Sequence, residues 1–518
     1  PSALYIGRSH QFIRSSTESR YVPGPLAPYL NPPGYSDRPA LLAPTDGGID
    51  PLALALRRQV HLAVEQVDET LMAEAATAVF SFMRDHSRRR VWTMEEAIIG
   101  KSCLGGLDAD AAPGVPWDSI AASMRKPAKK GTFFDVERAE ILRRNGSTRE
   151  RVALDVHPTL ISAVNRAMSL LADGKCPDWM MKCALKDEIV PEEKVTIGKT
   201  RMYYVAPIEH AIVCRMLFGD LIAQTMIDRV TYPGKVSCAV GVAPNDGTIR
   251  AFHTVASKGE SFAFAADQRG WDNHQHYELA RFLAKAINDW YPAREPTSIK
   301  TARTTFIKSC YNSLYVLNGV VYRMPFGLPS GVAFTSQMNS WYLEMVTLYS
   351  AFKALPPTLT PKLDMCTLKR ETFAFYYGDD SWVLFPECWG LTSSAIFAEM
   401  TKLGLEATHS IKNWPRTSEV PYERQTFLKR TIFVNADGHL VWALPLPVIE
   451  GQFAWTLRKH LHSRSVLMSV ITSHLEESAL YGKEYFEDRV KKIATACHEH
   501  GITLDVSTSI SAYSSRFL

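Results

Sequence analysis

A pair of adjacent carboxylates between two apolar runs constrains this chain more than any other feature of its sequence. Tyr377-Gly-Asp-Asp380 lies inside residues 372–385, where β-branched and aromatic residues flank the acids on both sides. Such flanks favour strands, and glycine supplies the backbone freedom that a tight turn needs. The segment therefore predicts a β-hairpin with the two acids at its turn. Because neighbouring carboxylates repel each other, a cation is their natural partner.

A second acidic segment upstream fits the same site. Residues 262–267 are apolar up to Asp267, which predicts a buried strand that ends in an acid, and Asp272 follows five positions later. Gly-Asp-Asp alone also closes ordinary surface hairpins, so this agreement carries more weight than the tripeptide. Two adjacent central strands would bring Asp267 and Asp379 together although they are far apart in the chain.

A loop and a helix are predicted between the two acidic segments. Residues 327–340 begin with a glycine-bearing loop that contains Ser330 and Gly331, and they continue with a helical pattern. Thr335 and Asn339 are four residues apart and would share one face of that helix. Taken singly, each of these two residues is an ordinary polar helix residue.

The order and spacing of these three blocks resemble the palm of viral RNA-dependent RNA polymerases. In that family motif A is Asp-x4-Asp, motif B is Ser-Gly-x3-Thr-x3-Asn and motif C is Gly-Asp-Asp, and all three patterns are complete here. The resemblance is to the picornavirus and calicivirus enzymes, with the double-stranded-RNA picobirnaviruses and partitiviruses as further relatives. It implies an α+β right-hand fold with fingers, palm and thumb, in which the palm is an antiparallel sheet backed by helices.

The resemblance implies template-directed synthesis of RNA from ribonucleoside triphosphates on an RNA template, by two-metal catalysis. Two Mg²⁺ ions about 3.5–4 Å apart activate the 3′-hydroxyl and stabilise the leaving oxygens, and Mn²⁺ can substitute for Mg²⁺. The metal-binding and catalytic acids would be Asp267 and Asp379, with Asp380 in support.

The same resemblance implies that the sugar is ribose. In the family, the second motif A acid works with the motif B asparagine on the ribose 2′-hydroxyl, which assigns nucleotide binding to Asp272 and Asn339. Thr335 would reach the same sugar, and the loop of Ser330 and Gly331 would contact the new base pair. Arg269, between the two motif A acids, is placed to pair with a neighbouring acid instead of facing substrate.

A basic segment upstream extends the resemblance beyond the palm. Residues 183–201 are similar to motif F, in which Lys-Asp-Glu, a central lysine and Gly-Lys-Thr-Arg precede a helix. A triphosphate carries several negative charges that such a cluster would hold. The matching basic residues, assigned to nucleotide binding, are Lys186, Lys194, Lys199 and Arg201.

Three shorter segments resemble further motifs. Pro113 and Gly114 resemble motif G, a loop that guides the template, and a plain proline turn fits the same residues equally well. Residues 404–412 resemble motif D and end at Lys412, a candidate general acid for the departing pyrophosphate or else a surface lysine. Phe427–Arg430 resembles motif E, a short strand under the primer end, which assigns Lys429 and Arg430 to the template and primer.

Composition is consistent with a globular protein that contacts a polyanion locally. The net charge is only +4, and residues 84–151 hold 14 Lys and Arg against 10 Asp and Glu, which suits either a template channel or a solvated helical face. Nine cysteines without a Cys-x-x-Cys pair indicate reduced thiols. No stretch approaches the roughly 18 apolar residues of a membrane span.

The motifs divide the chain into predicted domains. Periodicity further predicts helices at 70–84, 275–290, 392–404, 450–475 and 481–500, and a hairpin turn at Asn318-Gly319. The domains are an N-terminal arm with helices that bridge fingers and thumb (1–95), fingers (96–225), palm with motif A (226–288), a fingers insertion (289–322), palm with motifs B to E (323–433) and thumb (434–518).

Two other functions stay open at this point. A reverse transcriptase shares the palm and the paired acids, although Asp272 argues against it, and a non-catalytic RNA-binding or capsid-associated protein could keep the fold. Expected partners are template and nascent RNA, ribonucleoside triphosphates and viral capsid or replication proteins. The expected location is the host cytoplasm, in a replication complex or inside the virion. The mode of initiation is not readable from the sequence.

Overall fold

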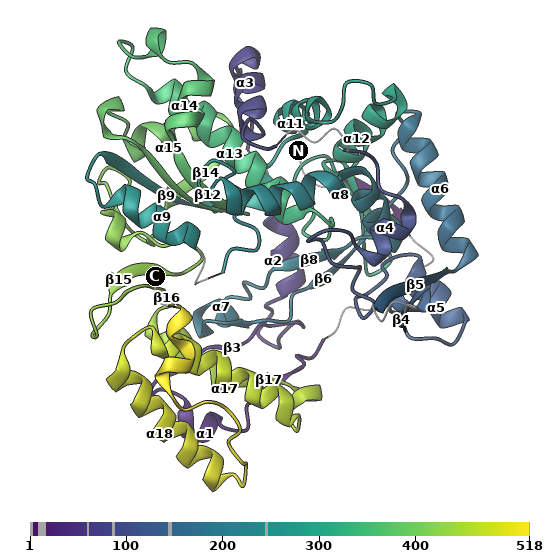
Figure 1. Cartoon of the computed structure of the whole chain (residues 1–518). Coiled ribbons are helices and arrows are strands. Elements are labelled where there is room, and N and C mark those ends of the chain that lie inside the picture. The colour runs from purple at the N-terminus through teal and green to yellow at the C-terminus, as the bar shows by residue number, and fades with distance from the viewer. Residues whose placement is uncertain are drawn as a thin grey trace.

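A four-stranded antiparallel sheet carries both acidic segments. It belongs to a computed structural model that describes residues 4–8, 17–59, 62–84, 89–142, 148–243 and 247–516 (Figure 1). The strand order is β12-β13-β9-β14, and Tyr377 pairs with Asp380, which leaves Gly378 and Asp379 at the turn and confirms the predicted hairpin. The strands are β9 (Ser261–Arg269), β12 (Phe373–Tyr377), β13 (Asp380–Pro386) and β14 (Glu406–His409).

The strands of this sheet, the palm sheet, consist mostly of apolar residues because both faces of the sheet are buried. On one face Phe264 packs against Phe397 of helix α15, with ring centroids 5.5 Å apart. On the other face Trp382 stacks on Phe252 of helix α9, with centroids 3.8 Å apart, and lies near Trp442 in the same cluster. The sheet is therefore backed by helices, as predicted. The helices are α9 (Gly247–Ala256), α13 (Thr335–Ala354), α14 (Met365–Glu371) and α15 (Ser393–Lys402).

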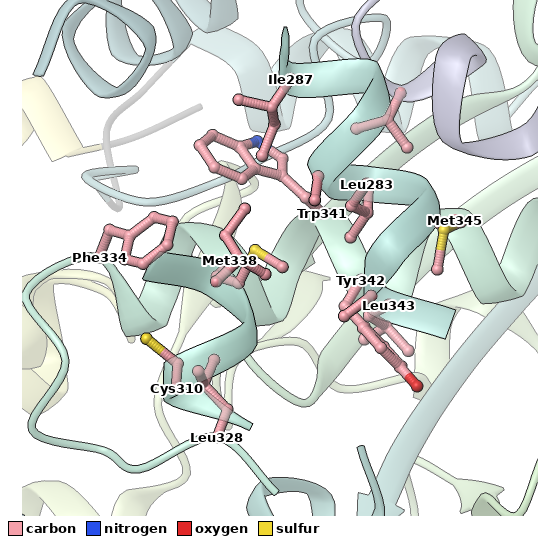
Figure 2. Close-up of a cluster of buried hydrophobic side chains, with 14 of the residues drawn as sticks. Leu283, Ile287, Cys310, Leu328, Phe334, Met338, Trp341, Tyr342, Leu343 and Met345 are labelled. Atoms are coloured by element: carbon pink, nitrogen blue, oxygen red, sulfur yellow. The ribbon is translucent and has the colours of Figure 1, made fainter. Parts of the chain in front are cut away.

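Helix α13 is buried along almost its whole length. Figure 2 shows Met338 and Trp341 of this helix gathered with Leu283 and Ile287 of α11 (Tyr277–Trp290) and with Cys310 at the end of α12 (Thr297–Cys310), and all five are at most 1% exposed. Burial of one large apolar side chain stabilises the fold by roughly 1.5–3 kcal/mol. Helix α13, which carries the predicted motif B residues Thr335 and Asn339, is thus fixed by packing from several sides.

A second sheet of five strands lies beside the palm sheet. Its order is β1-β11-β10-β6-β8, and only the β10-β6 pair is parallel. Asn318 and Gly319 have φ of 47° and 76° between paired Leu317 and Val320, so the predicted turn is confirmed. The strands are β1 (Leu4–Arg8), β6 (Met180–Leu185), β8 (Met202–Val205), β10 (Ser313–Leu317) and β11 (Val320–Met324).

Helix α8 (Ile208–Thr231) runs through the core between the two sheets. The sequence predicts that no stretch approaches a membrane span, but among the described residues this one helix is long and apolar enough to cross a membrane by length and composition. The 18-residue window that passes this test is 72% buried inside the protein. Ile212 and Phe218 have no exposed surface. Helices α4 (Met94–Ile99), α6 (Pro158–Ala172) and α12 pack against it. The other elements of this half of the chain are α3 (Glu69–Val79), α5 (Trp117–Ser123), β4 (Phe134–Leu142) and β5 (Thr148–Val156).

The N-terminal arm pairs with two distant parts of the chain. Strand β2 (Tyr21–Pro23) pairs with β17 (Trp455–Leu457), and β3 (Arg38–Pro39) pairs with β7 (Ile189–Val190). Between them, helix α1 (Ala27–Leu30) lies beside the C-terminal helices in Figure 1. The arm then continues into α2 (Pro51–Arg57). The arm therefore connects the C-terminal region to the segment that resembles motif F, while the domain boundaries stay predictions.

The C-terminal region corrects one sequence prediction. Helix α17 begins only at Arg464, because β17 and two short 3-10 turns occupy most of the preceding residues that were predicted to be helical from 450. The partner of β17 is more than 400 residues away, so no local pattern reveals it. The prediction for 481–500 is confirmed by α18. The elements are β15 (Thr431–Val434), β16 (Leu440–Ala443), α16 (Leu446–Glu450), α17 (Arg464–Ala479) and α18 (Lys483–Glu499).

Candidate active site in the palm sheet

Three acids come together where the pairing of the two central strands, β9 and β13, ends. Ser381 pairs with Ala266 of β9, so the next register position brings Asp380 beside Asp267, with Asp379 at the adjoining turn. One detail of the prediction is wrong: Asp267 does not end its strand, because β14 pairs with β9 as far as Arg269. The predicted convergence of the acidic segments is present.

Motif B holds the hairpin turn in place. Gly378 adopts φ of 64° and donates its backbone N–H to Oγ of Ser340, at 3.0 Å, from one turn inside α13. Oγ of Ser340 in turn donates to the carbonyl of Ser336 at 2.7 Å. Sequence reasoning did not assign Ser340 to the site, and no local signal distinguishes it from other helix serines.

The three carboxyl groups lie close enough to feel each other's charge. Asp267 and Asp379 are solvent-exposed, yet partial withdrawal from water raises the pKa of each above its ordinary value. The pKa of Asp380 is raised to about 7, first by burial and then by the charges of Asp379 and Asp267. The backbone N–H of Leu428 and the charge of Lys429 oppose this rise. Carboxyl groups this close to one another favour a cation as their partner.

The donor set fits a hard divalent cation. All three groups offer carboxylate oxygens, which Mg²⁺ prefers, and Mg²⁺ usually takes only one or two protein carboxylates and completes its shell with water and substrate phosphates. Within the described ranges, no group of three or more His, Cys, Asp or Glu side chains is arranged to hold a metal ion. A metal here would thus be shared between the protein and a phosphate-bearing ligand.

Asp272 and Asn339 meet beside the acids, as the sequence predicted. Nδ2 of Asn339 donates to Oδ1 of Asp272 at 3.2 Å, and Oδ1 of Asn339 accepts from Nε2 of Gln275 at 2.6 Å. Burial raises the pKa of Asp272 to about 6, which the hydrogen bond from Asn339 and the charge of Arg201 oppose. Gln275 and its partner Tyr311, at 3.0 Å, were missed by sequence reasoning.

The motif B loop is wedged between backbones that only glycine allows it to approach. A Cβ at Gly331 would lie 2.3 Å from the carbonyl oxygen of Tyr204 in β8. A Cβ at Gly327, which has φ of 77°, would lie 2.4 Å from the carbonyl oxygen of Asp272. Ser330, at the tip of the loop, is exposed. The loop thus touches both the motif A segment and the strand that follows motif F.

Thr335 holds the motif B loop through its hydroxyl. Its Oγ1 donates to the carbonyls of Val332 at 2.6 Å and of Pro329 at 3.0 Å. The Thr335 hydroxyl thus stabilises the loop and the first turn of α13. Contact of Thr335 with a sugar stays a prediction.

The motif F cations face the acids. Nε of Arg201 donates to Oε1 of Glu188 at 2.7 Å, and the charge of Arg201 lowers the pKa of both Asp379 and Asp272. Lys186 lies 3.4 Å from the same glutamate. Glu188, which belongs to the Lys-Asp-Glu signature, was not assigned a role, yet it holds two of the predicted triphosphate ligands in place.

Two more motif F lysines gather with the motif D lysine. The pKa of Lys194 is lowered, first by burial and then by the charges of Lys412, Lys199 and Arg201. Lys412 is exposed, and its charge lowers the pKa of both Asp267 and Lys194, so it lies near the motif A acid and near the basic cluster. Close like charges of this kind favour a polyanionic ligand.

Arg269 takes the role that the sequence left open to it. Its Nη1 lies 3.4 Å from Oε2 of Glu406, across the β9–β14 pair. The side chain therefore pairs with a neighbouring acid, which confirms that expectation.

The predicted motif E segment is a tight turn and not a strand. Phe427 and Arg430 exchange both backbone hydrogen bonds at 3.0 Å, and Leu428 and Lys429 at the tip have φ of 53° and 62°. Exposed Lys429 lies near Asp380, but the guanidinium of Arg430 pairs with Glu477 of α17 at 2.7 Å. The structure thus brings Lys429 to the site and uses Arg430 to attach the palm to the C-terminal helices.

The predicted motif G residues are buried. A Cβ at Gly114, which has φ of 76°, would lie 2.6 Å from the carbonyl oxygen of Ala206, and Pro113 is also buried beside it. Of the basic run in 84–151, Arg90 pairs with Glu96 and Lys129 pairs with Asp110 at 2.7 Å, whereas Arg88 lies outside the described residues. A template role for this region stays a prediction.

Comparisons with known proteins agree with this geometry. A family model described as viral RNA-dependent RNA polymerase matches residues 56–498. The genome polyprotein of feline calicivirus (strain Cat/United States/Urbana/1960) is 30% identical over 286 residues, which are 54% of this chain and 15% of that polyprotein. The genome polyprotein of human hepatitis A virus genotype IA (isolate LA) is 23% identical over 460 residues, 87% of this chain and 19% of that polyprotein. The chain thus spans less than a quarter of either relative.

A solved structure shares the whole fold. The structure titled Sicinivirus 3Dpol RNA dependent RNA polymerase superposes with a TM-score of 0.77 at 21% identity and covers 100% of this chain and 98% of that one. The predicted right-hand fold and the predicted kinship with picornavirus-like enzymes are therefore confirmed. The chain belongs to the viral RNA-dependent RNA polymerases, the enzymes that copy RNA into RNA during viral genome replication.

Proposed function

We propose that this chain polymerises ribonucleoside triphosphates on an RNA template to replicate or transcribe a viral RNA genome, with its chemistry at Asp267, Asp379 and Asp380. The observation that carries the proposal is the meeting of these acids on adjacent strands opposite Arg201. Negative charge for metal binding and positive charge for phosphate binding then lie on two sides of one site.

Members of this family generally use divalent metal ions, and here the ion would be Mg²⁺, with Mn²⁺ as a substitute. Bound metal supplies charge neutralisation and lowers the pKa of the attacking 3′-hydroxyl. Asp267 and Asp379 would hold it, because both are exposed to an incoming phosphate. Asp380 is less exposed and accepts a hydrogen bond from the N–H of Leu428. It would have a supporting role, in which it stabilises the hairpin turn and adds negative charge near the metal.

The basic residues would bind the triphosphate and assist the departure of pyrophosphate. Arg201 and Lys186 are preset by Glu188, which restricts the freedom that each side chain would otherwise lose on binding. Lys194 and Lys199 add charge behind them. Lys412, whose charge acts on Asp267, would give a proton to the pyrophosphate oxygen as it leaves.

Sugar selection would depend on Asp272 and Asn339. Their hydrogen bond presents a carboxylate and an amide together near the acids, and such a polar pair can recognise a 2′-hydroxyl. This arrangement favours an RNA polymerase over a reverse transcriptase, which has no use for a 2′-hydroxyl ligand.

The remaining proposals concern partners and location. The relatives are polyproteins, which suggests other viral replication or capsid proteins as partners in addition to template and nascent RNA. The proposed location is the host cytoplasm, within a replication complex or a virion. Primed and unprimed templates offered side by side would identify the mode of initiation.

The test is replacement of Asp379 by Ala in a primer-extension assay on an RNA template. Loss of one metal-binding carboxylate is expected to reduce incorporation by at least about a thousandfold, with little change in the melting temperature because the residue is exposed. Asp289→Ala, which removes an exposed acid from a surface ion pair, is the matched control and should leave the rate unchanged. Retained synthesis in the Asp379 variant would reject the metal role, and a preference for dNTPs would favour reverse transcription.

A further inference from the structure

A buried chain of hydrogen bonds ends at the acid that faces the predicted sugar. The hydroxyl of Tyr311 donates to Oε1 of Gln275 at 3.0 Å, Nε2 of Gln275 donates to Oδ1 of Asn339 at 2.6 Å, and Nδ2 of Asn339 donates to Oδ1 of Asp272 at 3.2 Å. Gln275 is 0%, Tyr311 1% and Asn339 5% exposed. Water therefore has little access to replace any member of the chain.

The direction of every bond in this chain is set from its acidic end. A carboxylate only accepts hydrogen bonds, so Asn339 must turn its NH₂ toward Asp272 and its oxygen toward Gln275. Gln275 must then turn its NH₂ toward Asn339 and its oxygen toward Tyr311, whose hydroxyl donates. Each amide has one orientation that satisfies both neighbours, and the reversed orientation would place two acceptors face to face.

The segment around Gln275 is also tied to the motif B loop. The backbone carbonyl of Gln275 accepts from the N–H of Gly327 at 2.8 Å, and the carbonyl of Asp272 accepts from the N–H of Leu328 at 2.8 Å. The hydrogen-bond chain thus crosses a junction where the motif A and motif B segments are already fixed to each other. Side-chain orientation is then the remaining freedom at this junction.

We propose that Gln275 and Tyr311 are positioning residues for sugar selection, which act by locking the amide of Asn339 so that its NH₂ faces Asp272. The inference rests on the proposed function, because it assumes that Asp272 and Asn339 contact the ribose. Neither Gln275 nor Tyr311 touches the nucleotide. They determine which atoms the pair presents to a 2′-hydroxyl.

Removal of the donor at position 275 would release that lock. In Gln275→Leu, the oxygen of Asn339 loses its buried partner, so the amide can rotate and the pair presents a mixture of orientations. Gln275→Glu keeps the shape of the side chain but replaces the donor by an acceptor, which favours the wrong orientation. Tyr311→Phe removes only the last hydroxyl and keeps the ring packing.

The experiment measures single-nucleotide extension of an annealed RNA primer and template with an NTP and with the matching 2′-dNTP. For Gln275→Leu and Gln275→Glu, the ratio of kcat/KM for NTP to that for dNTP is expected to fall about tenfold, mainly through a higher KM for the NTP. For Tyr311→Phe the expected fall is about threefold. The kinetics with dNTP should change little, which a loss of general stability would not produce.

Tyr342→Phe is the matched control. Its hydroxyl accepts from the backbone N–H of His276 at 3.2 Å and is not a member of the hydrogen-bond chain. Its ring is nevertheless stacked on that of Tyr311, with centroids 6.4 Å apart. This variant should keep the wild-type ratio. An unchanged ratio in the Gln275 variants and Tyr311→Phe, or an equal fall in Tyr342→Phe, would overturn the inference while the proposed function stands. A wild-type enzyme that incorporates neither nucleotide would overturn both.

Discussion

Single residues in this protein often owe their properties to burial rather than to a place in a motif. Glu209, in α8, is 8% exposed, and its Oε2 accepts from Nε1 of Trp117, which is 2% exposed. Burial raises the pKa of Glu209 to about 7. The sequence alone does not reveal this residue, because its hydrogen-bond partner, Trp117, is 92 positions away in the chain.

Glu209 makes the stability of the fold depend on pH. The unfolded carboxyl ionises near pH 4.5 and the folded one near pH 7, so between these values the folded protein keeps a proton that the unfolded chain has released. The free energy of unfolding therefore falls as pH rises through this window. Glu209→Gln still accepts from Trp117 and carries no charge. We expect it to exceed the wild type in stability at pH 8 by on the order of 2–3 kcal/mol.

The measurement is the melting temperature of both proteins at several values between pH 5 and pH 8. The advantage of the variant should shrink as the pH is lowered toward 4.5, because the wild-type residue is then neutral in the folded protein and the unfolded chain also begins to bind the proton. An advantage of equal size at pH 5 and pH 8 would show that Glu209 does not bind a proton in the folded protein.

At the scale of elements, local sequence patterns predicted the turns and helices that are stabilised by residues close to them in the chain. The Gly-Asp-Asp hairpin, the Asn318-Gly319 turn and helix α11 follow from turn residues and apolar periodicity, and each is present. Elements that depend on distant partners were not predictable, as β17 shows by pairing with β2. The motif E turn was missed for a similar reason, since positive φ at Leu428 and Lys429 is not indicated by their residue types.

The candidate site divides in the same way. The acids, the motif F cations and the Asp272–Asn339 pair followed from motif spacing and the resemblance. The supporting contacts of Ser340, Glu188 and Gln275 did not, because each depends on which side chains face one another across elements.

Motif F depends on the N-terminal arm for its position. Asp187 accepts from Oγ of Ser19 at 2.7 Å, from the backbone N–H of Arg20 at 2.8 Å and from Nε of Arg20 at 3.2 Å. Its side chain is 8% exposed. Lys186 and Glu188 lie one residue away on either side, so the arm fixes the connection between β6 and β7, which carries the predicted triphosphate ligand Lys186 and the partner of Arg201.

Asp187→Ala should therefore weaken nucleotide binding more than catalysis. Loss of three hydrogen bonds to a charged group leaves the arm and the motif F segment free to shift, and we expect KM for the NTP to rise about three- to tenfold with a smaller change in kcat. Steady-state kinetics of primer extension measure both constants. Asp289→Ala serves again as the surface control, and an equal change in both proteins would refute the role of the arm.

At the scale of the whole molecule, residues far apart in the chain are joined by few but specific connections. The arm joins the C-terminal region to motif F through β2–β17 and β3–β7, and Nε1 of Trp455 donates to the carbonyl of Asp37 at 2.9 Å. The buried Arg430–Glu477 pair forms a second connection, from the palm to α17. The C-terminal helices are thus attached to the rest of the protein on two sides.

The double attachment bears on how the protein comes apart when heated. Because the C-terminal helices are held by the arm through β2–β17 and by the palm through the Arg430–Glu477 ion pair, we expect them to melt together with the rest of the protein. Calorimetry of the intact chain should then show one cooperative transition. A protease recognition sequence inserted between Pro33 and Gly34, which are both exposed, would allow the arm to be cut between its two attachments. After cleavage the C-terminal helices should melt separately at a lower temperature, whereas the uncut insertion protein keeps one peak. A single unshifted peak after cutting would mean that the palm alone holds those helices. The arm would then contribute nothing to their thermal stability.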